Sequence, residues 1–133
     1  MKFRCKGAKH LNNYALNGYK LCFSHKTDHS VFGHANIIKS KKSKIKGAIW
    51  KITKEHEKEL DIYEGVDYGY YQKEYFTYKG KKVLVYIQKV YYFQKPSSKY
   101  LHTIIQGYKD CLLDTMYLKK VVMNYKINYK INW

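Results

Sequence analysis

Apolar and polar residues alternate in three segments of the first half of the chain, and this alternation predicts β-strands. Residues 19–24 alternate as a half-buried strand does, and residues 31–38 form a second segment of this kind. Residues 45–52 alternate again, with an isoleucine and a tryptophan on opposite faces. The lysine-rich stretch between the last two segments, residues 39–46, is predicted to be a hairpin loop.

A short helix is predicted after the third strand. The side-chain oxygen of Thr53 can accept a hydrogen bond from a free backbone N–H of the first turn, and Glu55 and Glu57 suit the positive end of the helix dipole. The helix is expected to run to about Ile62.

Strand signals return after this helix. A glycine-punctuated turn at residues 64–69 leads into residues 71–78, which are rich in side chains that fit a pleated surface. Lys79 and Gly80 are expected to close a hairpin. Residues 83–93 are nearly continuously apolar and aromatic, which predicts a central strand covered on both faces.

Helical spacing marks the last third of the chain, where residues 96–98 form a helix start signal. The apolar residues that then recur at helical spacing are Tyr100, Leu101, Ile104, Ile105 and Tyr108. The apolar residues on one face of a second helical segment are Leu113, Met116, Tyr117 and Val121. The near-repeat at the end, residues 124–133, is expected to be either an edge strand or a frayed tail.

This order of elements predicts an α+β fold. We expect a small mixed or antiparallel barrel-like sheet, a short helix before Glu64 and helices near the C-terminus. A chain of 133 residues with 45% hydrophobic residues and a single proline is expected to fold as one domain, residues 1–133.

The chain carries a formal net charge of +16 and contains 16 tyrosines. Lysine, tyrosine, asparagine and isoleucine share A/T-rich codons, so a base bias of the genome explains much of this composition. The charge still attracts nucleic acid non-specifically. The densest basic cluster, residues 39–46, is the main support for an alternative interpretation as a basic nucleic-acid-binding module.

Three cysteines at irregular spacing, Cys5, Cys22 and Cys111, favour a reducing, cytoplasmic compartment. The spacing of Cys22 with the nearby histidines at positions 25, 29 and 34 supports a metal site poorly. The longest apolar runs fall far below the roughly 20 residues of a membrane span, so no membrane partner is expected.

Several fragments resemble the γ-glutamylcyclotransferase family (AIG2-like), together and in the family's order. Residues 19–23 resemble its early aromatic-rich strand, residues 33–37 its next strand, and residues 46–52 the strand before the short helix. The run LDIYEGV at residues 60–66 resembles the family's most specific remaining motif, and residues 96–100 resemble its late loop.

The resemblance implies an intramolecular aminolysis, in which a γ-glutamyl compound releases its amine and closes to 5-oxoproline without a cofactor. It places Glu64 at the position of the family's catalytic carboxylate, which serves as acid and base. It also places Tyr71, Tyr86 and Tyr100 where the family has tyrosines that line the pocket and bind substrate.

The family's opening strand ends in a Tyr-Gly-Ser-Asn loop, and the sequence contains no such motif. Residues 3–8 already resemble the segment after the family's first helix, so we expect the opening strand and binding loop to be absent. A sheet without that strand exposes an edge that invites pairing, so a homo-oligomer is expected. The alternatives to an active enzyme are an inactive homologue that binds a small metabolite or protein partner, and the nucleic-acid-binding module.

Overall fold

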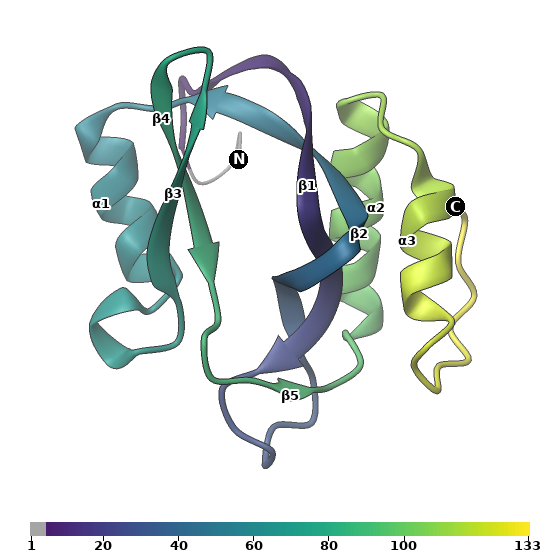
Figure 1. Ribbon diagram of the computed structural model, residues 1–133. Helices are drawn as coiled ribbons and strands as arrows, with labels where there is room; N and C mark the ends of the chain where they lie inside the picture. Colours follow the sequence, from purple (N-terminus) through teal and green to yellow (C-terminus); the bar gives the residue numbers. More distant parts are fainter. Residues whose placement is uncertain (1–4) are drawn as a thin grey trace.

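The computed structural model describes residues 5–133, in which the strands form two antiparallel sheets and helices pack at their sides (Figure 1). The three-stranded sheet has the order β2-β1-β5. Its strands are β1 (Lys9–His25), β2 (His34–Lys51) and β5 (Tyr92–Phe93). The two-stranded sheet consists of β3 (Gln72–Tyr78) and β4 (Lys81–Ile87). The α+β prediction is confirmed, although the two sheets do not close into a barrel. Residues 3 and 4 of the segment compared with the family lie outside the described residues.

The lysine-rich segment lies inside β2, so the predicted hairpin loop at residues 39–46 is wrong. Asn17 pairs with Lys44 and Tyr19 with Lys39, so two steps along β1 match five steps along β2. The surplus residues form a bulge opposite Gly18, whose φ of 82° is a conformation that glycine adopts without strain. The chain therefore bulges without reversing, and the two strands predicted on either side of residues 39–46 belong to one long strand.

Helix α1 (Lys54–Tyr63) begins as predicted. The Thr53 side chain accepts a hydrogen bond from the His56 N–H at 3.1 Å, and His56 Nδ1 in turn accepts the Thr53 N–H at 3.1 Å. This reciprocal capping satisfies two backbone donors that a helix end otherwise leaves unpaired. The helix ends at the residue before Glu64, and a short 3-10 turn, η1 (Val66–Tyr68), follows.

The β3–β4 hairpin also forms where predicted, with positive φ at Lys79 and Gly80. In contrast, the predicted central strand over residues 83–93 is wrong. Strand β4 ends at Ile87, and the side chain of Val90 is 63% exposed. The chain leaves the β4 ladder because the side chain of Asn36 in β2 hydrogen-bonds both backbone groups of Gln88. The Asn36 amide donates to the Gln88 carbonyl at 3.1 Å, and the Gln88 N–H donates to Asn36 Oδ1 at 2.9 Å.

Helices α2 (Ser98–Asp110) and α3 (Thr115–Val122) cover the β1–β2 side of the fold (Figure 1). Ser97 caps α2 by accepting the Tyr100 N–H at 3.1 Å. The buried core between these elements consists of Leu21, Phe23, Leu101, Ile105, Leu118 and Val122. The predicted apolar face of α3 is therefore displaced, since Leu118 and Val122 are buried whereas Met116 is 47% exposed.

Residues 124–133 take neither a helix nor a strand and pack along the core. The Tyr125 hydroxyl accepts the Phe23 N–H at 2.8 Å and donates to the Phe23 carbonyl at 2.9 Å. The side chains that pack on the core alternate along this segment: Tyr125, Ile127, Tyr129, Ile131 and Trp133. Across residues 5–133, the helices are too short or too polar to cross a lipid bilayer.

Candidate functional site

A large cavity lies between the two sheets and extends to helices α1 and α2. Its volume is about 1410 Å³, and its lining includes all four residues singled out from the sequence: Glu64, Tyr71, Tyr86 and Tyr100. They come from the C-cap of α1, the residue before β3, the C-terminal end of β4 and the first turn of α2. The fold thus brings together on one surface residues that are far apart in the sequence.

Glu64 is held in a rigid turn. It caps the C-terminus of α1, where its backbone N–H donates to the Leu60 carbonyl at 2.8 Å. Gly65 follows with a φ of +63°, and a Cβ there would lie 2.9 Å from the Tyr70 ring. A side chain at position 65 would be strained by the positive φ and would also collide with the Tyr70 ring. The turn that orients Glu64 therefore requires glycine.

Tyr71 and Tyr100 bind the two backbone polar groups of one residue in β2, Ala35. The Tyr71 hydroxyl donates to the Ala35 carbonyl at 2.7 Å, and the Ala35 N–H donates to the Tyr100 hydroxyl oxygen at 3.0 Å. Burial, followed by the nearby Tyr100 and Glu64, raises the pKa of Tyr71 well above its usual value. Tyr71 therefore remains a neutral phenol at physiological pH.

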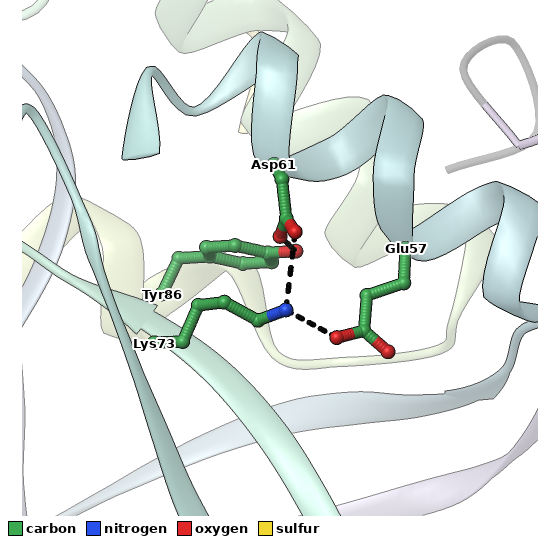
Figure 2. A network of polar contacts seen from close by, with 4 residues as sticks. All are labelled: Glu57, Asp61, Lys73 and Tyr86. Atoms are coloured by element: carbon green, nitrogen blue, oxygen red, sulfur yellow. Dashed lines mark hydrogen bonds and ion pairs between the residues drawn. The ribbon is translucent and has the colours of Figure 1, made fainter. Parts of the chain in front are cut away.

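Tyr86 belongs to a polar network that sequence reasoning missed (Figure 2). Its hydroxyl donates to Asp61 Oδ1 at 2.6 Å, and Lys73 Nζ contacts both Asp61 Oδ2, at 3.1 Å, and the Glu57 carboxylate. Burial raises the pKa of Tyr86, and its hydrogen bond to Asp61 and the charges of Glu57, Asp61 and Glu64 add to this effect. The hydrogen bond to Glu57 is the main cause of the raised pKa of Lys73.

A signal for this network exists in the sequence. Glu57, Asp61 and Glu64 recur at helical spacing, which places three carboxylates along one side of α1. Lys73, which lies between the carboxylates of Glu57 and Asp61, comes from β3. Nothing local in the sequence indicates that β3 faces this side of the helix.

The hydrogen-bond directions define what the site can bind. The hydroxyl protons of Tyr71 and Tyr86 point at protein acceptors, Ala35 O and Asp61 Oδ1. Neither hydroxyl therefore has a proton left to donate, and each oxygen can act only as an acceptor; the Tyr71 oxygen already accepts a hydrogen bond from the Gln88 side chain. Two phenol oxygens together with the Glu64 carboxylate suit a ligand group that donates N–H bonds, such as an ammonium group.

Two histidines lie on the same cavity. The His34 ring packs edge-on against Tyr100, with centroids 4.9 Å apart, and lies 6.4 Å from the His25 ring. Partial burial, with a smaller contribution from His25, lowers the pKa of His34. His34 is therefore neutral at physiological pH, with one ring nitrogen available as a donor.

The lowered pKa of His34 predicts that the protein becomes less stable as the pH falls below neutral. Between the usual histidine pKa of 6.5 and the lowered pKa of His34, the unfolded chain binds more protons than the folded chain, so stability falls as pH decreases through this window. We expect His34→Asn to show a smaller decrease in melting temperature between pH 7 and pH 5 than the wild-type protein. His29, whose side chain is 92% exposed, provides the control, and an equal change in His29→Asn would contradict the assignment to His34.

Cys22 and His25 at the end of β1, His29 in the following loop and His34 at the start of β2 do not assemble a metal centre. Within residues 5–133, no group of three or more His, Cys, Asp or Glu side chains is placed to hold a metal ion. Cys22 is buried, and desolvation raises the pKa of its thiol to about 11, so it is protonated and unreactive.

Comparisons with known proteins identify the family and the fold. The model of the AIG2-like family matches residues 44–121, which is more than half of the chain. A crystal structure of an uncharacterized human protein matches with a TM-score of 0.77 and 27% identity, over 98% of this chain and 83% of the human one. A structure described as a γ-glutamyl cyclotransferase matches with the same TM-score and coverage at 26% identity.

An uncharacterized Pyrococcus horikoshii protein shares the fold at 21% identity, with a TM-score of 0.54 over 74% of this chain and 75% of that protein. A comparison with curated protein sequences gives no match. The chain has an α+β fold of the γ-glutamyl cyclotransferase type. The chain belongs to the AIG2-like family, and the resemblance inferred from the sequence is confirmed.

Proposed function

We propose that this protein cyclises a γ-glutamyl compound to 5-oxoproline and releases an amine, with Glu64 as the proton-transfer group. The observation that carries the proposal is that Glu64, Tyr71, Tyr86 and Tyr100, taken from four separate elements, line one cavity. The similarity to a structure described as a γ-glutamyl cyclotransferase supports the same reaction.

In the proposed reaction, the Glu64 carboxylate takes a proton from the α-ammonium group of the substrate. The freed nitrogen attacks the γ-carbonyl carbon and forms the ring C–N bond. The attacking nitrogen now carries one surplus proton. The bond to the leaving amine breaks with its electron pair on the amine nitrogen, and Glu64 gives its proton to that nitrogen. Glu64 then takes the surplus proton from the ring nitrogen and passes it to the released amine, which leaves as an ammonium ion. The carboxylate ends the cycle as it began, so one acid/base group is enough.

The remaining residues of the site orient the substrate. Tyr71 and Tyr86 accept N–H bonds from the α-amino group, because their own protons are directed at Ala35 and Asp61. The neutral His34 supplies an N–H donor on the same cavity. Since nucleophile and electrophile belong to one molecule, holding the substrate folded removes most of the entropic barrier to ring closure.

The test is direct measurement of 5-oxoproline. The purified protein is incubated with a panel of γ-glutamyl amino acids, γ-glutamyl peptides and γ-glutamyl amines, and the product is quantified by mass spectrometry. Release of 5-oxoproline above the buffer rate is the expected result. Binding of these compounds without turnover by correctly folded protein would contradict the proposal and favour an inactive homologue that binds a metabolite.

A further inference from the structure

The cavity that contains Glu64 continues to the opposite end of the two sheets, at the β3–β4 hairpin. The lysines that line it there are Lys51, Lys79, Lys81 and Lys82. Lys79 lies over the Tyr78 ring at 5.3 Å, and Lys82 lies over the Tyr75 ring at 5.5 Å. We call these four lysines and the two tyrosines the lysine end of the cavity.

The two ends of the cavity differ in how their charges are satisfied. Near Glu64, the cavity is lined by Glu57, whose carboxylate is paired with Lys73. At the lysine end, the four ammonium groups form no ion pair with any carboxylate of residues 5–133. A cleft wall with several unpaired cations raises the local concentration of anionic groups, so this end suits a ligand that carries carboxylates.

A buried acceptor adds a second requirement. Asn12 lines the same end, and its Nδ2 donates to the Tyr78 hydroxyl at 2.8 Å. Its Oδ1 atom is buried and has no hydrogen-bond partner among the described residues. An unsatisfied buried acceptor is costly, so a ligand that offers an N–H donor would be stabilised here. A peptide supplies both backbone N–H groups and carboxylates.

The length of the cavity sets the size of the ligand. In the hairpin register, Lys73 pairs with Tyr86 near Glu64, whereas Tyr78 pairs with Lys81 at the lysine end. The two pairs are five residues apart along β3, which is about 17 Å at the usual rise of a strand. An extended chain needs about five residues to cover this distance.

We propose that the lysine end is a subsite for the amine part of the substrate, and that this part is an extended peptide with carboxylates in its last residues. The inference rests on the proposed function, because it places the γ-glutamyl group of that peptide at Glu64. A γ-glutamyl compound with a small amine occupies only the Glu64 end and leaves the lysines without an anion.

The test measures binding separately from turnover. The peptide γ-glutamyl-Ala-Ala-Glu-Glu and its neutral counterpart γ-glutamyl-Ala-Ala-Gln-Gln are titrated calorimetrically into the Glu64→Gln protein, which removes proton transfer but keeps the lysines. The acidic peptide is expected to bind about tenfold more tightly than the neutral one, the combined effect of two exposed ion pairs. Lys81→Gln with Lys82→Gln in the same background is expected to abolish this difference.

The control is Lys41→Gln with Lys42→Gln, which removes the same charge from the exposed bulge of β2, away from the cavity lining. This control is expected to keep the preference for the acidic peptide. Three results would overturn the inference. The two double variants could lose the preference equally, or the two peptides could bind equally well. A single-stranded oligothymidylate could also displace the acidic peptide with the same dependence on Lys81 and Lys82. Peptide binding without 5-oxoproline release by wild-type protein would contradict the proposed reaction alone and leave the subsite standing.

Discussion

Replacing Glu64 with glutamine is expected to lower the rate of 5-oxoproline release by about 10²- to 10⁴-fold, the usual effect of removing a general acid/base. Glutamine keeps the size and shape of the side chain, so the turn formed by Gly65 is preserved. The amide cannot take a proton from the α-ammonium group or return one to the leaving amine. The loss should therefore appear mainly in kcat, measured under saturating substrate.

Glu59→Gln provides the matched control. Glu59 lies on the same helix α1 but is exposed and does not line the cavity, so the identical chemical change there should leave the rate unaffected. Thermal melting of both variants establishes that each is folded. Activity that survives Glu64→Gln at the wild-type level would show that proton transfer uses another group, and the proposed mechanism would then be wrong.

The features predicted correctly from the sequence are those set by neighbouring residues. The Thr53 cap depends on a backbone N–H only three residues away, and the turn at Lys79 and Gly80 depends on its own backbone dihedral angles. The Ser97 cap of α2 is of the same kind. In each case the interacting groups are adjacent in the chain, so the residue pattern contains the whole interaction.

The features predicted wrongly depend on distant partners. A run of lysines at residues 39–46 is typical of a loop, but pairing with β1 on both sides keeps it in one strand. Residues 83–93 are apolar enough for a central strand, but Asn36 binds the Gln88 backbone and ends the ladder at Ile87. Hydrophobicity alone does not reveal either of these tertiary contacts.

The candidate site was predictable to the extent that a family motif identifies positions. Glu64 and the three tyrosines were named from the resemblance, and the fold places all four on one cavity. The motif contains no information about hydrogen-bond direction. That Tyr86 donates to Asp61, and that Lys73 joins Asp61 to Glu57, follows only from the packing of β3 and β4 beside α1.

The contact between Asn36 and Gln88 leads to the largest expected effect on stability. Asn36→Ala is expected to lower the free energy of unfolding by about 3 kcal/mol, because it leaves a buried backbone N–H and a buried carbonyl of Gln88 without partners. Both residues are only 2% exposed, so water cannot replace the lost bonds. The change corresponds to a decrease in melting temperature of about 10 °C for a chain of this size.

The free energies of unfolding in urea of Asn36→Ala and Asn17→Ala are compared. The comparison separates the loss of the Gln88 contact from the general effect of replacing an asparagine. Asn17 is exposed next to the β2 bulge, and its replacement should change the free energy of unfolding by less than about 0.5 kcal/mol. Equal values for the two variants would show that the Gln88 backbone finds other partners. Gln88 also lines the cavity and hydrogen-bonds Tyr71. The contact with Asn36 that joins the end of β4 to the three-stranded sheet therefore also positions part of the cavity wall, so the stability of the fold and the geometry of the site are linked at Gln88.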